Sequence, residues 1–175
     1  MSNSALAKYP VPRFEILRLR SLRNLKLLDS NPNPHLDELV RLAATVAETP
    51  MGALSLIDSD RQWFKSKIGL SIQETTRDIA FCAHTVMHPT AAFIIPDTTE
   101  SDLFRDNPLV SGDPHIKMYA GFPINAPNHG LTIGSLCVLD QKAKRLSHYQ
   151  IRVLQEIAVA IERTIEGIAI TRTTG

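Results

Sequence analysis

Apolar residues near the start of the chain recur at every third position, which is typical of a helix with one apolar side. These positions are Ile16, Leu19 and Leu22. They predict a helix over 14–26, and we expect the cations between them to form a solvated face. Those cations are Arg18, Arg20, Arg23 and Lys26. A second helix over 36–48 is predicted after Asn33, which can cap the first turn, and Pro34, which suits the first helical position.

The middle of the chain holds short apolar or alternating runs, which predict strands. Residues 51–57 are apolar and predict a buried strand. Residues 62–68 alternate, which predicts a half-buried strand with Phe64 and Ile68 on one face, paired with the first strand in a hairpin. The other face would carry Trp63, Lys65 and Lys67. Further strands are expected at 92–95, 118–124 and 132–139, a short helix at 80–88, a polar connection at 69–78 and a long irregular loop at 96–116. A loop of that length inside a domain is usually functional.

The last helix, over 147–170, has the clearest start. Ser147 and Gln150 have the spacing of a capping box, flanked by a hydrophobic staple from Leu146 and Ile151. Six apolar residues then follow an a/d repeat, and we expect them to pack against a second chain. They are Ile151, Leu154, Ala158, Ile161, Ile165 and Ile168. A second stripe would anchor the helix on its own sheet; it comprises Val153, Ile157 and Ala160. The alternative is one wide stripe buried within a single chain.

Adjacent strands joined by tight turns predict an α+β domain with an antiparallel sheet of five or six strands. We expect the helices from both ends of the chain to share one face of it, and the short helix to lie on the other. The domain would cover 13–170, between a loose leader over 1–12 and a tail over 171–175.

Composition excludes several classes of protein. Lys and Arg number 19 against 18 Asp and Glu, a net charge of +1, so no basic excess indicates a nucleic-acid binder. No apolar run reaches the roughly 18 residues of a membrane span, and no secretory signal is visible. Cys82 and Cys137 make no disulfide framework, so we expect a cytoplasmic protein with no nucleic-acid or membrane partner.

Seven short motifs along the chain resemble those of GAF domains, the small-molecule sensor modules of signalling proteins. They are LSLID at 54–58, DRQWFKS at 60–66, FCAH at 81–84, PD at 96–97, NPLV at 107–110, YAGFPI at 119–124 and GSLCVLD at 134–140. Their order and spacing are similar to the subgroup found ahead of sensor histidine kinases and diguanylate cyclases. The motifs are specific for fold and family but not for ligand.

The resemblance implies a PAS-related sheet with a ligand cavity under the short helix and the long loop. Its walls would be Phe81, Cys82, His84, Asp97, Phe104, Leu109 and Tyr119, with Trp63 near the rim. It also implies a ligand-regulated homodimer without catalysis or cofactor, which relays a signal to a kinase or cyclase output domain elsewhere.

Three alternatives start from single residues. Some GAF proteins are free methionine sulfoxide reductases with clustered cysteines, so Cys82 could be catalytic; its apolar neighbours along the chain favour an unreactive thiol with a raised pKa. A bilin attachment is disfavoured, because Ala83 separates Cys82 from His84. His84 and His88 share a helix face and could bind a metal or haem, but no third ligand is near in the sequence. A further possibility is a structural dimerisation domain with a filled cavity.

Overall fold

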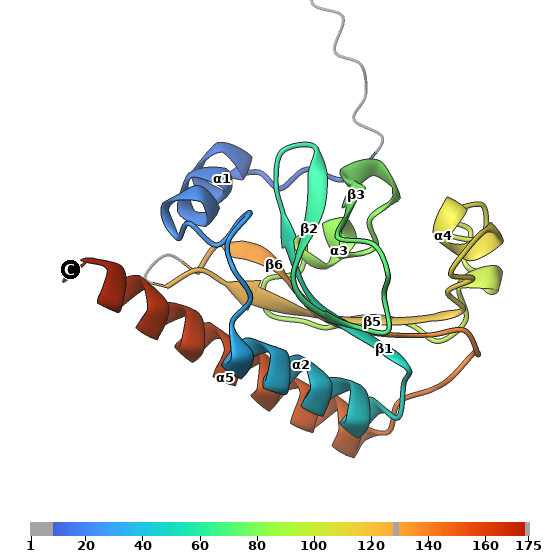
Figure 1. Ribbon diagram of the computed structural model, residues 1–175. Coiled ribbons are helices and arrows are strands. Elements are labelled where there is room, and N and C mark those ends of the chain that lie inside the picture. Colours follow the sequence, from blue (N-terminus) through green and yellow to red (C-terminus); the bar gives the residue numbers. More distant parts are fainter. Residues whose placement is uncertain (1–8, 128–129, 174–175) are drawn as a thin grey trace, which may run out of the picture.

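Six strands form one antiparallel sheet in the computed structural model, which describes residues 9–127 and 130–173 (Figure 1). The predicted leader over 1–12 and tail over 171–175 lie partly outside these residues. The strands are β1 (Met51–Ile57), β2 (Arg61–Ile68), β3 (Glu74–Thr76), β4 (Phe93–Ile95), β5 (Met118–Asn125) and β6 (Thr132–Asp140). Their order is β3-β2-β1-β6-β5-β4, and every neighbouring pair is antiparallel. The predicted α+β class is confirmed; β3 falls within the polar stretch 69–78 that we expected to be a connection.

Helices cover both faces of this sheet. They are α1 (Glu15–Asn24), α2 (Pro34–Ala47), α3 (Cys82–Thr85), α4 (Pro108–Ser111) and α5 (His148–Thr173), with 3-10 turns η1 (Arg77–Ile79) and η2 (Thr98–Glu100). Figure 1 shows α2 and α5 side by side along one face and α3 on the other. The predicted separation of the last helix from the short helix over 80–88 is therefore confirmed, although α3 itself has a single turn.

The first helix corrects two expectations. Figure 1 places α1 at one end of the sheet, away from the pair formed by α2 and α5, although its buried Leu22 joins the same core cluster as those two helices. Its buried side chains are Leu22 and Arg18, whereas Ile16 is 83% exposed. Arg18 is not part of a solvated face, because its guanidinium pairs with Glu15 and donates to the Ile57 carbonyl oxygen at 2.7 Å. These bonds satisfy the charge, so burial of the arginine is tolerated.

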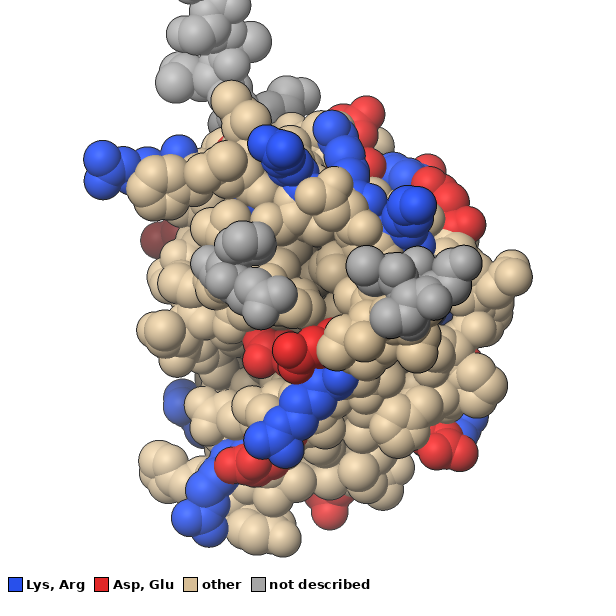
Figure 2. Space-filling view, turned by 90° about the vertical axis from the view of Figure 1, so that its left-hand side faces the viewer, with Lys and Arg blue, Asp and Glu red and all other residues tan. Residues whose placement is uncertain are grey.

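Figure 2 shows the end of the molecule that carries α1. Lys and Arg side chains lie beside Asp and Glu over this surface. Arg23 of α1 forms an ion pair with Asp58. The surface therefore presents both signs of charge there. Among the described residues, no helix is long and apolar enough to cross a membrane.

Both predicted helix starts are confirmed. The Asn33 side chain accepts hydrogen bonds from the backbone amides of His35 and Leu36, which caps α2. At α5, the Gln150 amide donates to the Ser147 hydroxyl and the Ser147 amide donates to the Gln150 side chain. Gln150 also donates to the Val46 carbonyl oxygen, which joins the start of α5 to the end of α2.

The a/d stripe of α5, which we expected to face a second chain, packs instead in the core of its own chain. Within a single chain, Leu154, Ile161 and Ile165 are fully buried and Ala158 is 5% exposed, all in the core shared with α2 and the sheet. Ile151 and Ile168 are half-buried at the edges of that core. Of the second stripe, Ile157 is buried, while Val153 and Ala160 are only half-buried. The a/d residues are thus buried in the core of a single chain and do not form the dimer interface that we expected.

A β-bulge in β2 explains another difference. Ser55 pairs with Phe64 and Leu54 pairs with Ser66, so Lys65 is an extra residue in β2. The extra residue reverses the alternation beyond it. Phe64 therefore packs in the cluster on the α3 side, whereas Ile68 packs on the α2 and α5 side, so our expectation of one shared face was wrong.

Candidate functional site

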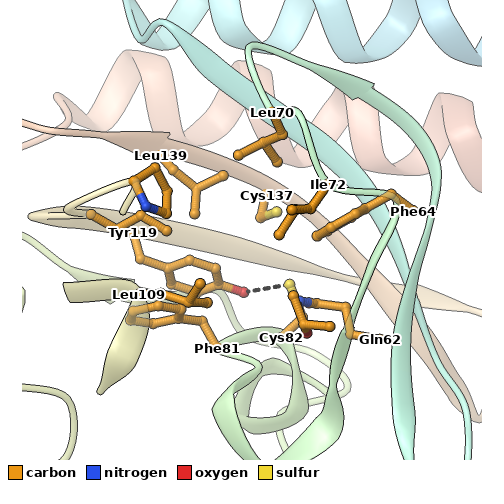
Figure 3. Close-up of a pocket in the computed structure, with 13 residues that line it drawn as sticks. Gln62, Phe64, Leu70, Ile72, Phe81, Cys82, Leu109, Tyr119, Cys137 and Leu139 are labelled. Atoms are coloured by element: carbon orange, nitrogen blue, oxygen red, sulfur yellow. Dashed lines mark hydrogen bonds between the residues drawn. The ribbon is translucent and has the colours of Figure 1, made fainter. Parts of the chain in front are cut away.

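A small cavity lies on the α3 face of the sheet, between the sheet, α3 and the loop that follows β2 (Figure 3). Its volume is about 30 Å³, room for about two molecules of the size of water. Its lining residues are Gln62, Phe64, Leu70, Ile72, Thr75, Phe81, Cys82, Leu109, Pro114, Ile116, Tyr119, Cys137 and Leu139. Four of the eight predicted ligand residues are among them: Phe81, Cys82, Leu109 and Tyr119.

Strand alternation and one asparagine position the walls of this cavity. Tyr119 pairs with Leu139 across β5 and β6, and Cys137 lies two residues before Leu139, so all three point to the α3 face. Asn107 accepts from the Leu109 amide, which caps α4, and its side-chain amide donates to the Ile79 carbonyl oxygen at 3.0 Å. This residue therefore holds the start of α4 beside the turn that leads into α3.

The loop after β2 covers the outer side of the cavity. The Lys67 ammonium group donates to the carbonyl oxygens of Leu70, Ser71 and Ile72, at 3.2, 3.3 and 2.8 Å. These bonds hold the Leu70 and Ile72 side chains over the cavity. A larger hollow of about 310 Å³ lies immediately outside and shares Leu70, Ile72 and Pro114 with the cavity. The loop thus separates the two spaces.

The inner wall carries a cluster of polar atoms around the Tyr119 hydroxyl. This hydroxyl shares a 2.6 Å hydrogen bond with the Thr85 hydroxyl and donates to the Cys82 sulfur at 3.2 Å (Figure 3). The Ser135 hydroxyl lies 3.5 Å away. Gly121, two residues along β5, leaves the space for this arrangement, because a Cβ there would collide with the Tyr119 and Thr85 oxygens.

The two cysteines meet at this cluster, and their pKa values move in opposite directions. Burial raises the pKa of the Cys82 thiol, but the hydrogen bond from Tyr119 and the nearby polar groups of Cys137, Ser55 and Ser135 outweigh it and hold that pKa below its ordinary value. The nearby Cys82 and burial raise the pKa of Cys137. Our expectation of a raised pKa at Cys82 is corrected, since the polar neighbours come from distant strands and not from adjacent residues.

Two predicted residues lie one layer behind the cavity. Phe104 is buried and stacks on Phe81 with ring centroids 4.6 Å apart, but it does not line the space. The His84 ring lies edge-on to Phe104 at 4.9 Å and stacks on Phe93 at 5.9 Å. Burial lowers the pKa of His84 to about 4, with repulsion from His88 as a second cause. His84 is therefore neutral near pH 7 and packs as an aromatic ring.

Two predicted residues lie elsewhere. The Asp97 carboxylate accepts from the Thr99 amide and hydroxyl, which caps η2, and it borders a surface hollow with Lys144 and Arg145. Its local turn chemistry explains its position. Trp63 is 6% exposed within the cluster on the α2 and α5 side, so it is not at the cavity rim.

Several lining residues were not foreseen. Phe64 was hidden by the bulge, and Leu70 and Ile72 belong to a stretch that reads as polar. Cys137 and Leu139 could have been found from the alternation of β6, given that Tyr119 opposes Leu139. Within residues 9–127 and 130–173, no three His, Cys, Asp or Glu residues cluster as metal ligands would.

Comparisons with known proteins agree on one family. The family model of the GAF domain matches residues 31–165. A cyclic di-GMP phosphodiesterase of Pseudomonas aeruginosa is 36% identical over 154 residues, which are 87% of this chain and 26% of that protein. The chain thus spans about a quarter of the length of that relative.

Solved structures share the fold. The GAF domain of an Acinetobacter phosphoenolpyruvate-protein phosphotransferase superposes with a TM-score of 0.64 at 16% identity, covering 91% of this chain and 96% of that one. The free methionine-R-sulfoxide reductase of Neisseria meningitidis, in complex with its substrate, gives 0.63 at 12% identity, covering 94% and 96%. At these identities the likeness shows the fold alone.

Proposed function

Because this chain belongs to the GAF domain family, we propose that it is a sensory module that binds a small molecule and relays its presence to an output domain or partner protein. The observation that carries the proposal is the cavity on the α3 face, opposite the face covered by α2 and α5. A ligand there could bias the sheet and the helices behind it, to the extent that it binds two states differently. The relative from Pseudomonas aeruginosa, a cyclic di-GMP phosphodiesterase, supports a signalling context, and we extend the expected outputs from kinase and cyclase to phosphodiesterase.

The lining specifies the chemical class of ligand. It contains no charged side chain, and most of its members are aliphatic or aromatic. Polar atoms come from Gln62, Thr75 and Tyr119. We therefore propose a small, uncharged and mainly apolar ligand with one hydrogen-bonding group. A ligand larger than about 30 Å³ would have to displace Leu70 and Ile72 toward the outer hollow.

Native mass spectrometry of the purified chain tests this proposal. We expect a co-purified small molecule, or a rise in melting temperature with members of a panel of neutral compounds. The variant Leu109→Phe adds bulk to the cavity wall and should lose this binding. Leu103→Phe is the matched control, because Leu103 is 59% exposed and does not line the cavity. Equal behaviour of the two variants would argue against this site.

We also propose that the chain forms a homodimer through the outer surface of α2 and α5. Leu42 is 48% exposed on α2 and Val159 is 40% exposed on α5. Half-buried apolar residues lie beside them on the same helices: Leu39, Val46, Val153 and Ala160. An apolar surface of this kind is typical of an interface between chains.

The small volume also favours a second function, a structural dimerisation domain whose cavity is filled by its own side chains. Failure of every ligand to bind, together with dimerisation, would favour this alternative.

We propose no reductase activity, because free methionine sulfoxide carries two charges and the lining offers no charged partner for them. Methionine sulfoxide turnover by the wild type should stay at background, and Cys82→Ser should not change it. Turnover that this substitution abolishes would make the chain an enzyme.

A further inference from the structure

Two cysteines that are 55 positions apart in the sequence line the same cavity. Cys82 belongs to α3 and Cys137 to β6, and the two elements pack directly on each other. Both side chains belong to the same buried cluster, and both are at most 2% exposed. Figure 3 shows both sulfurs directed toward the middle of the lining residues. The pair is free in this structure, as two thiols.

The surroundings of the pair are asymmetric. The Tyr119 hydroxyl donates to the Cys82 sulfur at 3.2 Å, and the Ser135 hydroxyl lies 3.5 Å from the same Tyr119 oxygen. Polar neighbours outweigh burial and hold the pKa of Cys82 below its ordinary value, whereas the nearby Cys82 and burial raise the pKa of Cys137, so Cys82 is the favoured thiolate. An attacking thiolate beside a protonated partner is the arrangement that dithiol oxidation requires.

We propose that Cys82 and Cys137 are a redox-active pair that a small hydroperoxide oxidises to an intramolecular disulfide. The Cys82 thiolate attacks the peroxide, the O–O bond breaks, and Cys82 becomes a sulfenic acid while water or an alcohol leaves. The Cys137 sulfur then attacks the Cys82 sulfur, an S–S bond forms, and the S–O bond breaks. The hydroxide leaves as water with the proton of Cys137. Two thiols lose two electrons and two protons, and the peroxide takes up both.

The cavity limits the oxidant to a very small molecule. About 30 Å³ accommodates hydrogen peroxide, which is similar in size to two water molecules, but excludes bulky hydroperoxides and aromatic thiol reagents. The uncharged lining favours a neutral molecule. The outer hollow shares Leu70, Ile72 and Pro114 with the cavity, so the peroxide would enter past these residues. This inference does not depend on the ligand proposed above, because it concerns the chain by itself.

The test uses the reduced full chain treated with hydrogen peroxide, then denatured, alkylated and weighed by intact mass spectrometry. We expect the wild type to lose both free thiols with a mass loss of two hydrogens, and to migrate as a monomer on a non-reducing gel. Retention of both thiols, oxygen addition at the cysteines without a disulfide, or a disulfide between two chains would overturn the proposal. This readout requires no variant, so it is valid even if the variants fold poorly.

Two variants assign the roles of the cysteines. Cys137→Ser should trap the sulfenic acid, detected as a dimedone adduct at Cys82. Cys82→Ser should leave Cys137 unmodified at the same peroxide concentration. Cumene hydroperoxide, a bulky oxidant, should oxidise the wild type at least tenfold more slowly than hydrogen peroxide does. Equal labelling of the two variants, or equal rates with the two oxidants, would contradict the assigned roles and the size limit.

Discussion

The Tyr119 hydroxyl joins three elements of this domain. It connects β5 to Thr85 and Cys82 in α3, and it lies 3.5 Å from Ser135 in β6. Tyr119 itself was foreseen as a cavity residue from its motif. Its partners were not, because they come from segments that are 16 to 37 positions away. A motif locates a side chain in the family's fold, whereas its hydrogen-bond partners depend on the register of strands and helices.

Gly121→Ala should disturb the hydrogen bonds around the Tyr119 hydroxyl. The added Cβ would collide with the Tyr119 and Thr85 oxygens, so we expect the free energy of unfolding to fall by about 1–3 kcal/mol, as for other overpacked cores. Chemical denaturation of the variant measures this loss. Gly167→Ala is the control, because nothing lies near that position on α5 and alanine favours a helix by about 0.5–1 kcal/mol. A destabilised control or an unaffected Gly121→Ala would show that the close contacts are not limiting.

His84 should make stability depend on pH. Burial, assisted by repulsion from His88, lowers its folded-state pKa to about 4, whereas an unfolded histidine titrates at about 6.5. The unfolded chain therefore binds a proton more readily across this window, and the free energy of unfolding should decrease as the pH falls from about 6.5 to 4. Above pH 6.5 His84 should contribute no slope.

Denaturant titrations at several pH values measure this effect. His84→Phe retains an aromatic ring beside Phe93 and should reduce the slope between pH 6.5 and 4. His148→Gln is the control, since His148 is exposed at the start of α5, and it should match the wild type. If His84→Phe keeps the full slope, the pH dependence has another source, such as Glu15 or Asp58, whose lowered pKa values act nearer the acid end.

At the scale of elements, the strongest sequence signals were those with a local physical cause. The caps at Asn33 and Ser147 were predicted correctly, because a cap depends on residues within one turn. The bulge at Lys65 was not foreseen, since nothing in an alternating run marks the extra residue. One inserted residue was enough to separate Phe64 from Ile68 and to bring Phe64 into the cavity.

The capping box of α5 allows a direct measurement. Ser147→Ala removes the hydroxyl that accepts from the Gln150 amide and should cost about 1 kcal/mol of folding free energy. Gln150→Ala should cost more, because it also removes the bond to the Val46 carbonyl oxygen that joins α5 to α2. Thermal and urea unfolding measure both. Gln155→Ala, at an exposed position on the same helix, should change stability by less than about 0.5 kcal/mol.

At the scale of the whole molecule, the sequence predicted the sheet and the placement of α5, but not which stripe of α5 would face the sheet. Both stripes are apolar, and only the position of α2 decides between them. Leu154, Ile161 and Ile165 occupy the core because α2 and the sheet enclose them together. The burial of Arg18 in α1 was missed for a related reason, because it depends on an ion pair with Glu15 and a hydrogen bond to the distant Ile57 carbonyl oxygen.

Because the a/d stripe of α5 is buried, substitutions on the outer surface of α2 and α5 should split the proposed dimer. Glutamate at Leu42 and Val159 places charge on the outer surface of α2 and α5, where each side chain is at least 40% exposed, so the chain should remain folded but become monomeric. Glutamate at Ile161 and Ile165 would bury two unpaired carboxylates at fully enclosed positions, at a cost that exceeds the stability of most domains of this size. That double variant should therefore unfold. Sedimentation velocity at micromolar concentration, with circular dichroism on the same samples, separates the two effects. A monomeric wild type would refute the dimer, and a folded Ile161→Glu, Ile165→Glu variant would show that α5 can leave the core.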